Sequence, residues 1–236
     1  MNFQSLRVLD VRDCNMNEVS VSLRKLKHLR YLNLSHNPIQ VLPEFITSLY
    51  NLQTLKLNHC SNLRELPKEM RKMVSLRHIE LCKLDKCTEM PVEMGRLTNL
   101  QTLTYFIVGK DGGRSIKQLK YLNLGGELTI CGLENVTSGI EEAREANLRG
   151  KDDIRSLTLL MGLGSWNGVD SESDDVLEGL EPHPNLKKCL IQYFVGAKYP
   201  TWMANGFSAY KNLTENSIIA VATLVLEQLL LLLQGW

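Results

Sequence analysis

A leucine-based motif recurs at a nearly fixed interval through residues 1–108, and no other feature of the chain constrains its fold as strongly. Each copy follows the pattern Leu-x-x-Leu-x-Leu, with Ile, Val or Tyr in place of a leucine in some copies. The copies begin at Leu6, Leu29, Leu52, Leu76 and Leu100, which gives periods of 23, 23, 24 and 24 residues. A period of this length fits one strand followed by one returning segment.

The second copy, residues 29–51, shows why such units must stack. Its inward apolar residues are predicted to be Leu29, Leu32, Leu34, Ile39, Leu42, Ile46 and Leu49. Burying seven side chains of this size gives about 10–20 kcal/mol, whereas ordering the backbone costs on the order of 1–2 kcal/mol for every residue. One copy alone is therefore unstable, and neighbours must cover it. The sequence predicts an α/β leucine-rich repeat solenoid, with parallel strands on its concave face and short helices or turns on its convex face.

Alternation along each predicted strand separates inward from outward side chains. Parallel pairing would make Leu9, Leu32, Leu55 and Ile79 neighbours in one inner row, while the outward residues form columns on the concave face. Solenoids commonly use such a face for binding. The predicted partner-binding residues are Val8, Asp10, Arg12, Tyr31, Asn33, Ser35, Thr54, Lys56, Asn58, His78, Glu80, Thr102, Thr104 and Phe106.

The period breaks after residue 108. Residues 109–115 are predicted to be a glycine-rich turn, because their lysine precedes the paired glycines and so does not match a phosphate-binding loop. Strands are predicted at residues 126–133, 154–159 and 186–193. We therefore interpret residues 1–108 as regular repeats and residues 109–214 as irregular repeats that continue the solenoid.

Two helices are predicted within the irregular repeats. Ser138 and Glu141 have the spacing of a capping box, and Gly150 lies at the expected end of that helix. Residues 170–175 are predicted to be an acidic loop that precedes a short helix.

Residues 215–236 form an apolar tail of unclear role. The tail has no Pro or Gly between Ser217 and Gln234, which predicts a helix. Its apolar stretch, residues 218–233, contains Glu227 and is shorter than the ~20 residues that a membrane span needs. The sequence therefore favours packing on the open end of the stack, or no native role, over a membrane anchor.

Composition and charge exclude several other functions. The net charge is +1, with +5 in residues 1–100 and −4 in residues 101–236, which is far too little for a nucleic-acid-binding surface. No signal peptide precedes the first repeat, so a cytoplasmic location is expected. No catalytic group of Ser, His, Asp or Cys can be assembled from the spacing, and neither an enzyme activity nor a cofactor is predicted.

The six cysteines do not suggest a disulfide framework or a zinc site. Cys14 and Cys60 occupy the motif position that Asn37 holds in the second repeat, where the side chain is expected to turn inward and bond the backbone. Buried thiols in a reducing compartment are the favoured interpretation.

Several segments resemble one family in particular. They are residues 29–35, 39–43, 52–55, 95–109, 126–136, 142–148 and 199–203, within a match that covers roughly residues 3–214. They are similar to the repeat region of plant nucleotide-binding leucine-rich-repeat disease resistance proteins of the coiled-coil class. The regular repeats are generic, whereas the irregular segments make the resemblance narrow.

The resemblance implies a non-catalytic protein-recognition module in plant defence. It implies sensing of a pathogen effector, directly or through a guarded host protein, and restraint of a nucleotide-binding switch. No residue of the chain matches that switch or its phosphate loop, so the chain is expected to be a fragment. The alternatives are a membrane-tethered repeat adaptor anchored by residues 218–233, and a truncated remnant without function.

Overall fold

The structure is a computed structural model that describes residues 4–82, 86–87, 89–161, 171–194, 196, 198–204, 210 and 218–222. The chain divides into two units. The first unit contains residues 1–107 and 121–124, and the second contains residues 108–120 and 125–236. The break in the repeat period and the division between the units thus lie one residue apart.

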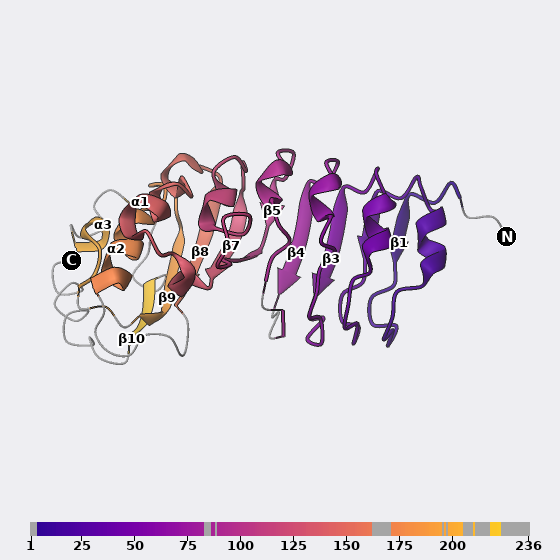
Figure 1. The fold of residues 1–236 in the computed structure, drawn as a ribbon, viewed down its shortest axis with the longest axis horizontal. Coiled ribbons are helices and arrows are strands. Elements are labelled where there is room, and N and C mark those ends of the chain that lie inside the picture. The colour runs from indigo at the N-terminus through magenta and orange to yellow at the C-terminus, as the bar shows by residue number, and fades with distance from the viewer. Residues whose placement is uncertain are drawn as a thin grey trace. The chain divides into compact units, whose positions relative to one another are not determined.

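Parallel strands and short helical turns alternate along the first unit (Figure 1). The strands are β1 (Val8–Asp10), β2 (Tyr31–Asn33), β3 (Thr54–Asn58), β4 (His78–Cys82), β5 (Thr102–Leu103) and β6 (Tyr105–Ile107). The turns are the 3₁₀ helices η1 (Val21–Lys25), η2 (Glu44–Ser48), η3 (Met70–Lys72) and η4 (Met94–Arg96). Figure 1 shows these turns together along one side of the strands.

The first sheet has the order β1-β2-β3-β4-β5, with every pair parallel. Its register pairs Leu9 with Leu32, Leu32 with Leu55, and Leu55 with Ile79. The predicted inner row is therefore confirmed, and so is the predicted leucine-rich repeat solenoid. A whole repeat separates successive strands because parallel pairing needs a crossover connection.

The inward residues of the second repeat are all buried. The seven predicted side chains, from Leu29 to Leu49, are at most 1% exposed. In the first repeat the corresponding residues Leu9, Leu23 and Leu26 are only half-buried, because in the described structure neighbours cover them on one side. The contrast shows directly that a repeat obtains its core from the repeats on both flanks.

Asn37 ties the bend after β2 to the first repeat. Its side-chain amide donates to the carbonyl oxygens of Val11 and Leu34, both at 2.9 Å, and to that of Ser35 at 3.2 Å. Its oxygen accepts from the backbone N–H groups of Cys14 and Met16, at 3.1 and 3.0 Å. The inward bonding expected at this motif position is thus confirmed for Asn37, which is 1% exposed.

The two cysteines at the same motif position behave differently. Cys60 is buried, and its thiol bonds the carbonyl oxygen of Leu34 at 3.3 Å, as expected. The expectation of a buried thiol is wrong for Cys14, which is exposed although its thiol contacts the carbonyl oxygen of Arg12. The reason is position, because Cys14 belongs to the first repeat, on which the described residues pack a neighbouring repeat from one side.

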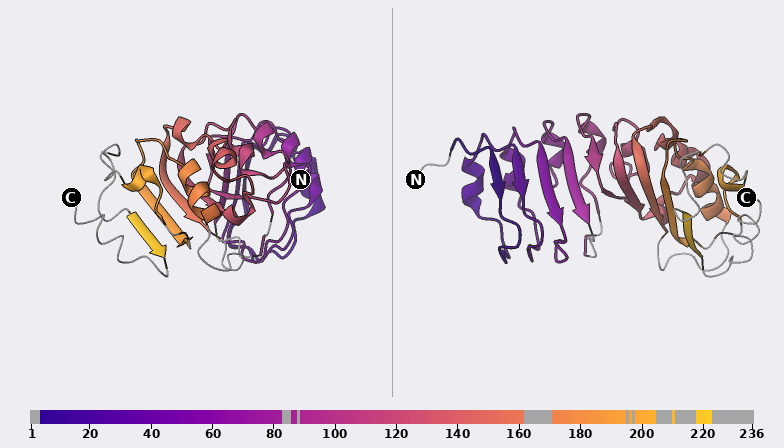
Figure 2. Two further views of the ribbon diagram at one scale, coloured as in Figure 1. Left: turned by 60° about the vertical axis from the view of Figure 1, so that its left-hand side comes forward. Right: turned by 180° about the vertical axis from the view of Figure 1, so that it is seen from behind.

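In its described residues, the second unit contains longer strands and three α-helices. Its strands are β7 (Gly126–Cys131), β8 (Ile154–Leu160), β9 (Lys188–Phe194) and β10 (Ile218–Ala222). Its helices are η5 (Ile116–Leu119), η6 (Leu133–Asn135), α1 (Gly139–Arg144), η7 (Leu148–Gly150), α2 (Ser171–Gly179) and α3 (Thr201–Ala204). Strands β7 to β10 pair in parallel in that order, and Figure 2 shows β10 at the edge.

The helices of the second unit depart from prediction. Helix α1 ends at Arg144, well before Gly150. The Ser138 side chain makes no capping hydrogen bond. Instead, the Glu142 carboxylate accepts hydrogen bonds from the backbone N–H groups of Thr137 and Ser138. These N–H groups at the start of the helix are therefore satisfied by Glu142 and not by the predicted capping box. The predicted acidic loop is also wrong from Ser171 onward, because those residues begin α2.

The predicted tail helix is wrong for the part of the tail that the structure describes. Residues 218–222 form β10, which pairs with β9 from Cys189 to Phe194. Ile218, Ile219 and Val221 are β-branched, and such residues favour a strand when an edge is free to pair. The rest of the tail, including Glu227, lies outside the described residues.

Ion pairs link the helical turns of the third and fourth repeats. Arg71 pairs with Glu69 at 3.2 Å and with Glu93 at 2.7 Å, while Lys72 pairs with Glu69 and Arg96 with Glu93. Hydrogen bonds from Lys72 and Arg71 lower the pKa of the Glu69 carboxyl, and those from Arg71 and Arg96 lower that of Glu93.

We expect these pairs to weaken in acid. A carboxyl whose pKa is lowered by folding contributes its stability above its ordinary pKa, near 4.5, and loses it as the pH falls further. Arg71→Gln should therefore lower the urea midpoint at pH 7, and the difference from the wild type should shrink as the pH falls below that value. Arg24→Gln on η1 is the control, and a difference that stays constant with pH would contradict the expectation.

Candidate protein-recognition surface

The outward side chains of β1 to β5 share one face of the first sheet, which we call the strand face. Its first column is Val8, Tyr31, Thr54, His78 and Thr102, aligned by the strand register. Its second column is Asp10, Asn33, Lys56 and Glu80. These alignments of the predicted columns are confirmed from β1 to β4, and neighbouring repeats contribute side chains of different chemistry. Thr104, which was predicted for the second column, lies beyond the end of β5.

The charges on the strand face pair with one another. Arg12 binds Asp10 at 2.7 Å, and Lys56 of β3 binds Glu80 of β4 at 3.0 Å. The amide of Asn58 donates to Glu80 at 3.2 Å. The hydrogen bond from Arg12 lowers the pKa of the Asp10 carboxyl, so that carboxyl stays ionised at neutral pH. Charged side chains thus occupy fixed positions on the face, and the two cations, Arg12 and Lys56, neutralise the two anions, Asp10 and Glu80.

Two predicted members of the face are buried. Asn33 and Ser35 are 3% and 5% exposed. The Asn33 amide donates to Asp10 and its oxygen accepts from the N–H of Ser35, while the Ser35 hydroxyl accepts from the N–H of Asn58. These short side chains hold neighbouring strands together and offer almost no surface to a partner, which corrects their predicted role.

Phe106 is not on the strand face. Its side chain is fully buried, which contradicts the prediction that it contacts a partner. Strand β5 ends at Leu103, and the Thr104 hydroxyl binds both the N–H and the carbonyl oxygen of Leu81, at 2.8 and 2.6 Å. This interruption restarts the alternation in β6, so Phe106 points into the core.

Exposed groups gather at the start and at the ends of the strands. Val8 is 60% exposed, and Tyr31 is half-buried with the Lys56 ammonium 6.0 Å from the centre of its ring. At the ends of β2 and β3, His36 and His59 stack with ring centroids 4.5 Å apart. Both histidines have a positive φ, 57° and 58°, which turns the chain and presents their rings.

His36 and His59 were not among the predicted partner-binding residues. The signal that could have found them is their equivalent position in the motif, 23 residues apart and shortly after the strand of each repeat. Their stacking depends on the left-handed backbone that both adopt, which the spacing alone does not reveal. The imidazole pair extends the strand face beyond the ends of the strands.

The described residues offer neither a metal-binding cluster nor a membrane-spanning helix. Among them, no group of three or more His, Cys, Asp or Glu side chains is arranged to hold a metal ion. In that same part of the chain, no helix is long and apolar enough to cross a membrane. All six cysteines are free thiols.

Comparisons with known proteins agree with this architecture. The family model described as leucine-rich repeat region matches residues 1–232. A disease resistance protein of Arabidopsis thaliana is 43% identical over 208 residues, which cover 85% of this chain and 14% of the relative. Disease resistance protein RGA2 of Solanum bulbocastanum is 41% identical over 216 residues, which cover 89% of this chain and 21% of the relative. The chain therefore spans about a fifth or less of these relatives.

One solved structure supports the fold alone. A plant peptide hormone receptor, solved in complex with its peptide, is similar with a TM-score of 0.53 and 15% identity, over 93% of this chain and 33% of the receptor. The leucine-rich repeat region that the family model describes is a protein-interaction architecture and not a catalytic one.

Proposed function

Because this chain belongs to the leucine-rich repeat family and is a repeat region like those of plant disease resistance proteins, we propose that its strand face recognises proteins in plant defence. The proposed partners are a pathogen effector or a guarded host protein, and a nucleotide-binding switch that the repeat region restrains. That switch would be a domain outside residues 1–236. A cytoplasmic location accords with this proposal.

The observation that carries the proposal is the pairing of charges on the strand face, within the first repeat for Asp10 and Arg12 and between β3 and β4 for Lys56 and Glu80. An interface that buries a lone charge is costly, whereas the pairs Asp10–Arg12 and Lys56–Glu80 enter an interface already neutralised. Tyr31 then lies between these pairs as an aromatic anchor, and tyrosine is enriched among the residues that dominate binding energy. Such a face combines a specific charge pattern with a smaller desolvation cost than unpaired charges would have.

The restraint can be tested by binding in trans. The probe is RGA2 of Solanum bulbocastanum from which the matched region has been removed, titrated with this chain. Tyr31→Ala should weaken binding by roughly tenfold, the loss typical of an aromatic anchor. Exchanging the charges, Lys56→Glu with Glu80→Lys, keeps the ion pair but reverses the pattern, and should weaken binding by at least as much.

A matched control uses an ion pair away from the strand face. Glu141 and Arg144 pair at 3.2 Å on helix α1, and exchanging them should leave binding unchanged. Reversing the charge of Asp10, Lys56 or Glu80 alone is less informative, because each such substitution would also break an ion pair in the folded chain. Binding that both strand-face variants leave intact would refute restraint through this face.

A further inference from the structure

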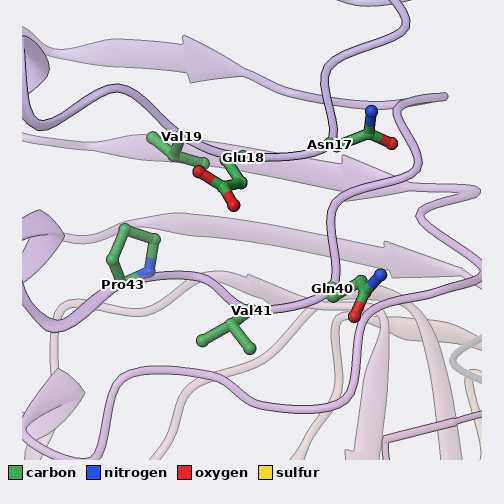
Figure 3. Close-up of a pocket in the computed structure, with 6 residues that line it drawn as sticks. All are labelled: Asn17, Glu18, Val19, Gln40, Val41 and Pro43. Carbon is green, nitrogen blue, oxygen red and sulfur yellow. The ribbon is translucent and has the colours of Figure 1, made fainter.

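An open hollow lies between the returning segments of the first two repeats. It has a volume of about 360 Å³ and is lined by Asn17, Glu18, Val19, Gln40, Val41 and Pro43. Figure 3 shows the two segments side by side, with the Glu18 carboxylate on the side of its segment that faces Val41 and Pro43. None of these residues belongs to the strand face, so the hollow is a separate feature of the first unit.

The hollow exists because two equivalent segments are not joined by main-chain hydrogen bonds. One step further along the stack, the N–H of Arg64 bonds the carbonyl oxygen of Gln40 at 2.8 Å, and the N–H of Leu42 bonds that of Glu65 at 3.0 Å. Val41 and Glu65 form a parallel bridge there. Within residues 4–82, all of which the structure describes, no main-chain hydrogen bond joins residues 17–19 to residues 40–43.

The lining combines an apolar floor with polar groups. Val19 is 8% exposed and Val41 is 46% exposed, so an aliphatic chain entering the hollow would cover Val41 in particular. The Glu18 carboxylate is exposed and forms no ion pair with any described residue. Asn17 and Gln40 add two amide oxygens, which accept hydrogen bonds.

We propose that this hollow binds an arginine side chain of a protein partner. The methylene stem of arginine packs against apolar side chains, and its guanidinium carries five N–H donors in a planar fork. The stem would lie on Val41 and Pro43, and the guanidinium would bind the Glu18 carboxylate and the amide oxygens beside it. Charge complementarity with an unpaired carboxylate selects a cationic occupant, and several acceptors around it favour the fork over a single ammonium.

The test titrates the whole chain with N-acetyl-arginine methylamide and, separately, with the corresponding citrulline compound. Citrulline keeps the shape of arginine but has no charge. The readout is the methyl NMR signals of Val19 and Val41, with the exposed Val74 as an internal reference. We expect a saturable shift with the arginine compound, and binding of the citrulline compound weaker by roughly threefold to fivefold, as for an exposed ion pair.

Two glutamate variants test whether the hollow is the site that binds the arginine compound. Glu18→Gln removes the charge and should reduce arginine binding to the citrulline level. Glu65→Gln makes the same change at the equivalent position of the third repeat, where the segments are bridged, and should leave binding unchanged. Equal binding of both compounds, or equal loss in both variants, would overturn the proposal. The outcome is independent of the strand face, because the probe requires no defence protein.

Discussion

Replacing Asn37 by leucine is expected to lower the free energy of unfolding of the first unit by about 3–5 kcal/mol, because each buried group left without a partner costs about 1–3 kcal/mol. Leucine has a similar size but neither donates nor accepts. The N–H groups of Cys14 and Met16 would lose their acceptor, and the carbonyl oxygen of Val11 would lose its donor. Hydrogen exchange of the amides of β2 and β3 measures the effect within this unit.

A surface asparagine provides the comparison for Asn37. Asn51 makes one bond between repeats, from its amide to the carbonyl oxygen of Lys27 at 2.8 Å, and it is exposed. Asn51→Leu should cost about 1 kcal/mol or less, since water replaces the lost donor. If the two variants were equally mild, Asn37 would not hold the first two repeats together as described.

The second large effect is expected from Leu55→Ala in the middle of the inner row. Leu55 is fully buried between Leu32 and Ile79, and a leucine-to-alanine change in such a core costs about 2–5 kcal/mol. The cost is high because the rigid stack on both flanks limits how far the cavity can collapse. Urea unfolding followed by circular dichroism, together with exchange at β3, measures this loss.

Leu9 is the matched control, because it occupies the same inner row one repeat before Leu32. It is only half-buried, so Leu9→Ala should cost clearly less than Leu55→Ala. Equal losses at both positions would mean that burial in the row does not come from neighbouring repeats, contrary to the packing of the first unit.

The fold was predictable where the motif repeats. The period of 23 or 24 residues determined which residues meet, so Leu9, Leu32, Leu55 and Ile79 could be aligned from the sequence alone. The inward set of the second repeat followed from the same alternation. Geometry of this kind is set by the chain itself, because a parallel register in a solenoid has no freedom once the repeat length is fixed.

The residues of the strand face were less predictable, because local hydrogen bonds override the inward and outward alternation of side chains along a strand. Phe106 turns inward since the Thr104 hydroxyl interrupts the strand before it, and no spacing rule anticipates that bond. Asn33 and Ser35 lie in the predicted columns but are covered by the neighbours they bind. In the tail, helix propensity alone missed β10, whose strand form depends on the free edge of β9.

The ion pair between Lys56 and Glu80 also constrains how this surface can change over time. The two residues belong to different repeats, and each neutralises the other. A single substitution at one of them would leave an unpaired charge on the next repeat, with a cost to any complex that buries it. New binding specificity on this face is therefore expected to arise through coordinated substitutions in adjacent repeats. Neighbouring repeats would then evolve as coupled pairs and not one by one.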